Sequence, residues 1–314
     1  METKAGHARQ VIVLGIIATL GGCLSNAAVT GGKAGPGTPI VTYEQRKTAP
    51  SKRVSDRPGN TNGAVFVAMY HHIRAGKGDM FRTESQFRAD LEHFYAMGFR
   101  PVLASEYLSN HMSLPPGASP IVMTFDDATP SQIQLRPDGS VDPNCAVGIW
   151  EDFAKTHPDF PVHATFFVLP ETLWGPRKAD PRKVKLVFDL GSELANHTIN
   201  HPKLKALTDE KVKLELGTAE DRLEAMGQKG PHAMALPYGI SPKHPAILKG
   251  FDWKGRRINF TGVFLVGANP APSPTSPKFN RYRVPRIIAY SIPYGIDYWL
   301  KQVKDGHVKL YVEP

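Results

Sequence analysis

Short apolar runs rich in β-branched and aromatic residues alternate along this chain with segments in which apolar residues recur at helical spacing. The clearest strand-like runs are Ala64–Tyr70, Ile121–Phe125 and His163–Leu169, and the clearest helical patterns span 83–98, 145–157 and 208–227. This alternation predicts a parallel sheet with helices packed outside it, and so many units favour a closed or nearly closed barrel. In such folds the chemistry lies at the carboxyl ends of the strands.

Size and composition are those of an ordinary globular protein, with 314 residues of which 41% are hydrophobic and 21% charged. Two cysteines, Cys23 and Cys145, are too few for a disulfide framework. The net charge of +9 comes from the two ends of the chain, because residues 63–241 carry 18 Lys and Arg against 22 Asp and Glu. No basic run is interleaved with aromatic residues, so nucleic acid is not a predicted partner.

The N-terminus has the pattern of an export signal. A basic start precedes the apolar run Val11–Leu20, which is too short to span a bilayer as a helix. The run closes on LGGC, Leu20–Cys23, which resembles the lipobox of bacterial lipoproteins. That resemblance implies a signal peptide over 1–22 and a lipid on Cys23, with ordinary cleavage near Ala27–Ala28 as the alternative.

Residues 23–62 are rich in Gly, Pro, Ser and Thr and almost free of periodic apolar residues. Such a composition cannot bury enough apolar surface to fold, so we expect a flexible tether here and a folded domain over 63–314. With a lipid on Cys23, the domain would be exported and anchored at the cell envelope. Leu24 is not the Asp that often retains bacterial lipoproteins at the inner membrane, so the outer membrane or cell surface is the expected position.

Two adjacent carboxylates, Asp126 and Asp127, follow the strand-like run Ile121–Phe125. An aspartate is common where a strand ends, but that fits one aspartate better than two. Like charges this close raise each other's pKa unless a cation is nearby. The pair therefore raises the question of whether the chain also supplies a metal site.

Two histidines, His197 and His201, lie four residues apart in NHTINHPKL. On a helical turn that spacing puts both imidazoles on one face. A histidine pair in a loop is often incidental, but two imidazoles and one carboxylate make a three-ligand site with room for water, which is a catalytic arrangement. The nitrogen-rich ligand set favours zinc. Side chains of adjacent residues in an extended segment point opposite ways, so one aspartate can bind the metal while its neighbour acts as a base.

Four motifs in this order, YHHI, TFDD, HTINH and LPYG, resemble those of the polysaccharide deacetylase (NodB-homology) family. The resemblance covers roughly residues 65–242 and implies a distorted, incomplete (β/α) barrel and metal-dependent hydrolysis of acetyl groups on sugars. Of the motifs, TFDD and HTINH are specific together, whereas LPYG alone is weak.

The resemblance also implies a role for each matching residue. Asp126 resembles the general base, and Asp127, His197 and His201 resemble the ligands of a divalent metal. Tyr238, in LPYG, resembles the residue whose backbone N–H helps to hold the oxyanion.

The chain departs from the family pattern at the arginine that pairs with the catalytic aspartate, because that position is Ala235. Arg283 or Arg286, in YRVPRI, could replace it from another strand. The preceding Pro285 can bend the strand and re-aim its successor, so Arg286 is the preferred candidate and Arg283 the second. The family's late histidine has no counterpart in this chain. His71 and His72 follow a strand and could line the pocket, and at least one of them is expected to be a core histidine.

These observations favour a metal-dependent deacetylase that acts on an envelope or extracellular polysaccharide, with N-acetyl groups as the first expectation. An O-acetyl carbohydrate esterase and a non-catalytic sugar-binding protein on the same fold are the alternatives. Hydrolysis is favoured because a binding protein has no evident need of a free Asp126 beside a ligating Asp127. No protein partner is evident, and the polymer, the bond type, the metal and the oligomeric state stay open.

Overall fold

A mostly parallel β-sheet organises the part of the chain described by this computed structural model, residues 52–175 and 180–314. The predicted signal peptide, Cys23 and most of the predicted tether lie outside the described residues, so export and lipidation stay predictions. Within the described residues, none of the helices has the length and apolar character needed to cross a membrane.

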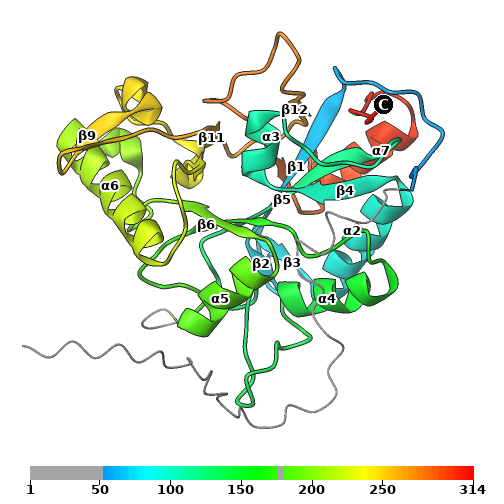
Figure 1. The fold of residues 1–314 in the computed structure, drawn as a ribbon, viewed down its shortest axis with the longest axis horizontal. Helices are drawn as coiled ribbons and strands as arrows, with labels where there is room; N and C mark the ends of the chain where they lie inside the picture. Colours follow the sequence, from blue (N-terminus) through cyan, green and yellow to red (C-terminus); the bar gives the residue numbers. More distant parts are fainter. Residues whose placement is uncertain (1–51, 176–179) are drawn as a thin grey trace, which may run out of the picture. The chain divides into compact units, whose positions relative to one another are not determined.

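The continuous path of the sheet runs in the order β11-β8-β7-β6-β5-β1-β12, and β4 and β13 pair with β5 and β1 beside it. Every pairing is parallel except that of β12 with β1. The strands are β1 (Ala64–Tyr70), β4 (Phe99–Val102), β5 (Ser119–Asp126), β6 (Thr165–Val168), β7 (Glu193–Asn196), β8 (Met234–Ala235), β11 (Val263–Phe264), β12 (Ala271–Pro272) and β13 (Ile287–Ile288). The curled sheet is open, so the predicted incomplete barrel is confirmed (Figure 1).

Alternation along the central strands divides the core between the two faces of the sheet. Phe66 and Phe125 belong to one buried cluster, together with apolar residues of α2 (Glu84–Ala96), α4 (Ala146–Thr156) and α5 (Pro181–Asp189). Val67 belongs to a second cluster with residues of α3 (Ala104–Ser109). Since β1 and β5 are covered on both faces, their sequences are nearly continuous apolar runs.

The longer elements lie where the sequence predicts them, and several of the shorter strands do too, among them β7, β8 and β11. The predicted capping box of α2 is present, with Thr83 and Gln86 each accepting a hydrogen bond from the backbone N–H of the other. Of the expected strand YRVPRI (282–287), only Ile287 lies in a strand, at the start of β13. Elements of the described residues not mentioned so far are β2 (His72–Ile73), β3 (Phe81–Arg82), α6 (Asp209–Ala225), β9 (Phe251–Trp253), β10 (Arg256–Ile258), α7 (Ile296–Lys304) and three short 3-10 helices, η1 (Leu204–Ala206), η2 (Pro237–Gly239) and η3 (Pro245–Lys249).

The folded part begins earlier than the predicted Gly63. Asn60 forms a β-bridge with Val312. The Oγ of Ser55 and the Nη2 of Arg57 both donate to the carbonyl of Gly117, at 2.7 and 2.8 Å. Residues 52–62 are thus held by hydrogen bonds to backbone groups rather than by apolar burial, which is why composition alone suggested a tether.

A buried ion-pair network joins β1, β3, α2 and α7. Asp90 lies fully buried on α2 and accepts from the Nε of Arg82 and from the hydroxyl of Tyr70, each at 3.0 Å. Arg82 also donates to Asp297 on α7 at 2.9 Å. Removal of one partner from such a pair leaves a charge buried without compensation.

We therefore predict that Asp90→Asn lowers the free energy of unfolding by about 3–5 kcal/mol, measured by urea denaturation. Asp159→Asn is the matched control, because Asp159 pairs with Arg100 at 2.6 Å but its side chain is 49% exposed. That control should cost less than about 1 kcal/mol. Equal losses in the two variants would contradict a stabilising role for burial of the network.

Candidate active site

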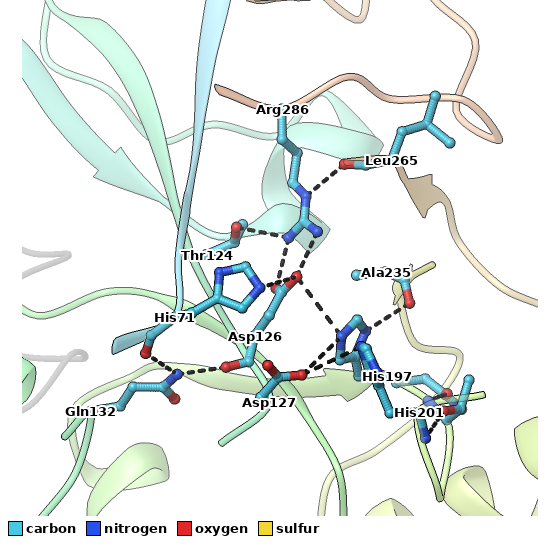
Figure 2. Close-up of polar contacts among 12 residues, drawn as sticks. His71, Thr124, Asp126, Asp127, Gln132, His197, His201, Ala235, Leu265 and Arg286 are labelled. Atoms are coloured by element: carbon cyan, nitrogen blue, oxygen red, sulfur yellow. Dashed lines mark hydrogen bonds and ion pairs between the residues drawn. The ribbon is translucent and has the colours of Figure 1, made fainter. Parts of the chain in front are cut away.

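The paired aspartates lie at the carboxyl end of β5. Asp126 is the last residue of the strand and is buried, and Asp127 donates its backbone N–H to the carbonyl of Phe167 at 3.1 Å. Asp127 and Ala128 both have positive φ, of 70° and 50°. A left-handed turn therefore sets the directions of the two carboxylates, and the predicted extended alternation at Asp127 is wrong. Both carboxylates lie near the same imidazole, that of His197 (Figure 2).

One of the aspartates forms a cluster with both predicted histidines. The Oδ1 of Asp127 lies 3.4 Å from the Nε2 of His197 and 3.6 Å from the Nε2 of His201, and one ligand atom of each residue lies within 4.8 Å of the others. His197 is buried at the end of β7, and its Nδ1 lies 2.9 Å from the carbonyl of Ala235. Because a carbonyl only accepts, Nδ1 carries the proton and the lone pair of Nε2 faces the cluster.

The cluster fits a divalent metal ion. The Oδ1 of Asp127 is buried and has no hydrogen-bond partner among the described residues, which is costly for an ionised oxygen. A cation between this oxygen and the two imidazoles would compensate its charge. Two nitrogen ligands and one oxygen ligand suit a borderline ion such as zinc, and three protein ligands leave a position free for water or substrate.

The other aspartate is paired with an arginine. Asp126 accepts from Arg286 through both oxygens, Nη1 to Oδ1 at 2.7 Å and Nη2 to Oδ2 at 2.6 Å, and both side chains are buried (Figure 2). Arg286 also donates to the carbonyl of Leu265 at 2.8 Å and to the hydroxyl of Thr124 at 3.1 Å. The structure thus brings Arg286 to Asp126, while Arg283 is exposed.

The arginine decides the charge of the buried aspartate. Burial alone raises the pKa of Asp126, but the Arg286 charge, followed by that of His197 and the hydrogen bonds from Arg286, outweighs burial and holds this pKa below its usual range. Arg286 reaches this place because its backbone passes close to Gly267, where an added Cβ would lie 3.1 Å from the N and O atoms of Arg286.

A third imidazole, His71, lies next to the aspartate on its other side. Its Nε2 is 3.9 Å from the Oδ2 of Asp126, and burial lowers its pKa. The adjacent His72 instead stacks on Phe81, with ring centroids 4.5 Å apart. The YHHI motif was the signal for His71, although the sequence could not tell which of its histidines faces the site.

Sequence reasoning missed the buried amide of Gln132. Its Nε2 donates to the carbonyls of His71 and Asp126, at 2.9 and 2.6 Å (Figure 2). Its Oε1 accepts from the indole N–H of Trp174 at 3.2 Å. The backbone N–H of Trp174 in turn donates to the carbonyl of Ala128 at 2.8 Å. One side chain thus joins the ends of β1 and β5. A lone glutamine five residues after the TFDD motif carries no signal in the sequence.

Tyr238 lies at the edge of the cluster, in η2, with a φ of 57°. Its ring is 55% exposed and its centroid lies 4.5 Å from that of His201. The structure therefore gathers Asp126, Asp127, His197, His201, Tyr238 and Arg286 at the carboxyl edge of the sheet, with His71 and Gln132 in addition.

Residues 114–249 match the family model described as Polysaccharide deacetylase. This segment of the chain is thus similar to the polysaccharide deacetylase family. The matched segment contains the paired aspartates, both clustered histidines and Tyr238, but ends before Arg286. Arg286 thus lies outside the matched part.

Two curated proteins are similar in sequence. A Geobacillus stearothermophilus protein described as an uncharacterized 30.6 kDa protein in the fumA 3' region is 36% identical over 90 residues, 28% of this chain and 31% of that protein. The Bacillus subtilis (strain 168) protein named "Putative polysaccharide deacetylase YxkH" is 21% identical over 235 residues, 70% of this chain and 76% of that protein. The chain thus covers less than a third of the length of the first relative.

Solved deacetylase structures share the fold. The Streptococcus pyogenes deacetylase PplD in complex with acetate has a TM-score of 0.55 at 20% identity, over 72% of this chain and 92% of that chain. IcaB from Ammonifex degensii has a TM-score of 0.56 at 17% identity, over 76% and 97%. A polysaccharide deacetylase from Bacillus cereus has a TM-score of 0.56 at 18% identity, over 78% and 69%. The predicted fold class is confirmed.

The Asp126–Arg286 pair predicts a pH dependence of stability. A carboxyl whose folded pKa is depressed contributes stability above its unfolded pKa, near 3.8, and loses it as pH falls through the folded pKa. In Arg286→Gln, burial is no longer opposed by the arginine, so the folded pKa of Asp126 rises above the unfolded one. The variant should then lose stability, relative to the parent protein, as pH rises from about 4 to 7.

Urea unfolding over this pH range, with a chelator present throughout, measures the effect. Arg283→Gln is the matched control, because Arg283 is an exposed arginine three residues away. The control should keep the parent's pH dependence. If Arg286→Gln also kept it, the arginine would not be what holds Asp126 ionised.

Proposed function

We propose that this protein is a metal-dependent hydrolase that removes acetyl groups, N-acetyl groups in the first place, from a polysaccharide. The observation that carries the proposal is the division between two adjacent carboxylates. Asp127 joins two imidazoles in a three-ligand cluster, while Asp126 is paired with Arg286 beside it. The polysaccharide deacetylase match supports the substrate class, and the structural neighbours from Streptococcus pyogenes and Bacillus cereus are described as deacetylases.

Asp127, His197 and His201 are the residues that would hold the ion. A divalent ion bound there supplies a Lewis acid for the acetyl carbonyl and a water nucleophile at neutral pH. One of these ligands is oriented in advance. The hydrogen bond between the Nδ1 of His197 and the carbonyl of Ala235 fixes the orientation of the His197 ring.

Asp126 is the general base in this proposal. Its depressed pKa keeps it ionised at neutral pH, so that it can accept the proton of the attacking water. A carboxylate offers about four lone-pair sites, so Asp126 can keep both bonds to Arg286 and still accept this proton. Gln132 bonds the backbone carbonyls of both Asp126 and His71, so it holds these two residues in a fixed relative position for the reaction.

Two further groups act on the acetyl amide. His71, 3.9 Å from Asp126, is an imidazole outside the metal cluster that is placed to relay to the leaving amine the proton that Asp126 takes from the water. It takes the place of the family's late histidine, which the sequence lacks. The backbone N–H of Tyr238 donates to the developing oxyanion, a contribution of about 3–4 kcal/mol for one well-placed donor.

We predict that the two aspartates differ when each is changed to asparagine. Asp126→Asn should keep zinc affinity but lose acetate release by about 10²-fold or more, because the proton acceptor is gone. Asp127→Asn should lose zinc affinity at least tenfold, because a charged ligand becomes neutral. Isothermal titration with zinc and metal analysis of the purified variants measure the first quantity, and an acetate assay the second. Identical behaviour of the two variants would refute the assigned roles.

Acetate release from acetylated saccharides tests the function itself. We expect release from oligomers of N-acetylglucosamine, loss of release with a chelator, and recovery when zinc is added back. Acetylated xylan, which carries O-acetyl groups, is the comparison substrate, and release from it alone would identify an esterase. A zinc-loaded protein that binds these saccharides and never releases acetate would be a sugar-binding protein on the same fold.

A further inference from the structure

A buried polar cluster behind the metal site joins α6 to the end of β7 and the start of β8. Its side chains are those of Asn196, Glu220 and His232, with 0%, 3% and 3% of their surface exposed. Asn196 is the last residue of β7, Glu220 lies on α6, and His232 precedes β8. Polar groups buried this deeply cost free energy unless they are hydrogen-bonded, so their bonds show what the cluster holds in place.

The imidazole of His232 is the charged end of the cluster. Its Nδ1 lies 2.6 Å from the Oε2 of Glu220, and its Nε2 lies 3.3 Å from the carbonyl oxygen of Gln228. A carboxylate and a carbonyl only accept, so both ring nitrogens carry a proton. Burial alone lowers the pKa of His232, but the hydrogen bond and the charge of Glu220 outweigh burial and hold this pKa above its usual value. His232 and Glu220 thus form a buried ion pair.

The other carboxylate oxygen of Glu220 fixes the side-chain amide of Asn196. The Nδ2 of Asn196 donates to the Oε1 of Glu220 at 2.8 Å and to the carbonyl of Leu216 at 3.1 Å. Since both of these groups accept, the amide nitrogen faces α6 and the amide oxygen faces away from it. Glu220 therefore selects one of the two orientations that this amide can take.

The amide oxygen of Asn196 holds the segment that carries both imidazoles of the metal cluster. Its Oδ1 accepts from the backbone N–H of Thr198 at 2.8 Å, and the Oγ1 of Thr198 accepts from the backbone N–H of His201 at 3.0 Å. Asn196 and Thr198 flank His197 in the sequence. The two hydrogen bonds thus fix the backbone on either side of His197 and at His201.

This segment needs such support because its backbone is strained. Thr198 and His201 have positive φ, of 69° and 53°, although neither is a glycine. Other residues keep this conformation only where the surrounding structure fixes it. If the amide of Asn196 were turned round, its nitrogen would face the N–H of Thr198, and a donor would meet a donor. The turn between His197 and His201 would then lose its buried hydrogen bond.

The same cluster also bears on the ring of His197. The backbone N–H of Asn196 donates to the carbonyl of Ala233 at 3.0 Å, and the carbonyl of Ala235 lies 2.9 Å from the Nδ1 of His197. His232 begins this segment, and its ion pair with Glu220 connects the segment to α6. The pair thus supports the strand whose carbonyl orients the His197 ring.

We propose that Glu220, paired with His232, is a positioning residue of the metal site that acts through the amide of Asn196. It sets the geometry at which His197 and His201 meet Asp127, and it contacts none of these three residues itself. The inference rests on the metal cluster of the proposed function, and it adds the buried residues that fix two of the three ligands.

The zinc affinity of Glu220 variants tests the proposal without a substrate. Glu220→Met keeps the volume of the side chain but removes both acceptor oxygens. It should weaken zinc binding by about 10–100-fold, the usual loss when a residue that orients a metal ligand is changed. Glu220→Gln keeps an oxygen for the amide of Asn196, and a neutral His232 can accept at Nδ1, so this variant should retain most of the affinity. Isothermal titration of protein stripped with a chelator measures both.

Cobalt bound in place of zinc reports the geometry of the site. The visible absorption of Co²⁺ depends on the arrangement of its ligands. Glu220→Met should therefore change the cobalt spectrum, whereas Glu220→Gln should keep that of the parent. Urea unfolding in the presence of a chelator shows that each variant is folded. We expect the turn to survive, because Glu215 on α6 also accepts from the N–H of Asn200, at 3.0 Å.

A double-mutant cycle shows whether Glu220 acts through Asn196. If it does, Glu220→Met should weaken zinc binding in the parent but hardly at all in an Asn196→Ala background. Glu224→Met is the matched control, because Glu224 lies one turn further along α6 and its side chain is 42% exposed. The control should leave the zinc affinity and the cobalt spectrum unchanged. Should Glu220→Met not fold, Asn196→Ala, expected to lose affinity as far, and Glu220→Gln carry the test.

Parent affinity and spectrum in a folded Glu220→Met, or additive losses in the cycle, would overturn the proposal and leave the deacetylase function standing. A loss in Glu220→Gln as large as that in Glu220→Met or Asn196→Ala would overturn it too, because the acceptor oxygen is still present. A parent protein that binds no zinc would contradict the metal cluster, and with it the proposed function and this inference.

Discussion

The buried pair of Asp126 and Arg286 is the interaction on which the site depends. Removing a carboxylate from water raises its pKa, and in this position burial is nearly complete for both partners. Without the guanidinium, the carboxyl would tend to be neutral and could not accept a proton. The same guanidinium donates to groups on β5 and after β11, so one side chain sets the electrostatics of the site and also connects these two parts of the sheet.

The division of labour between neighbouring carboxylates follows from the backbone. The chain leaves β5 through two consecutive non-glycine residues with positive φ, which costs of order 1–3 kcal/mol at each. The turn is held by hydrogen bonds from the backbone of Asp127 to Phe167 and from Trp174 to Ala128. The turn gives Asp127 its place in the cluster with His197, and leaves Asp126 on the side of the arginine. Strain stored in this way is expected where geometry serves chemistry.

Much of this could be predicted from the sequence, and the limits have physical causes. Long apolar runs and the capping box at Thr83 specify their own structure locally, so β1, β5 and α2 were found. The TFDD and HTINH motifs predicted the three residues of the metal cluster, because residue type and spacing suffice to indicate ligands. The choice of Arg286 over Arg283 rested on the bend expected at Pro285, a local effect that sequence can show. The strands β8 and β11 were predicted as longer apolar segments, because a strand of two residues is too short to have a period that would set its bounds.

Features that depend on backbone contacts between residues far apart in the chain could not be predicted from the sequence. Residues 52–62 are held by carbonyls far along the chain, and the Gln132 amide acts on carbonyls brought together only by folding. Neither leaves a pattern in composition or spacing.

Anomalous diffraction at the zinc edge, from crystals of the zinc-loaded protein, tests the central claim most directly. The account predicts one ion within about 2.0–2.2 Å of ligand atoms from Asp127, His197 and His201. Asp126 should remain outside the coordination sphere and paired with Arg286 through both oxygens. An ion bound to Asp126, or an Arg286 released from it, would contradict the separation of metal ligand and base on which the account depends.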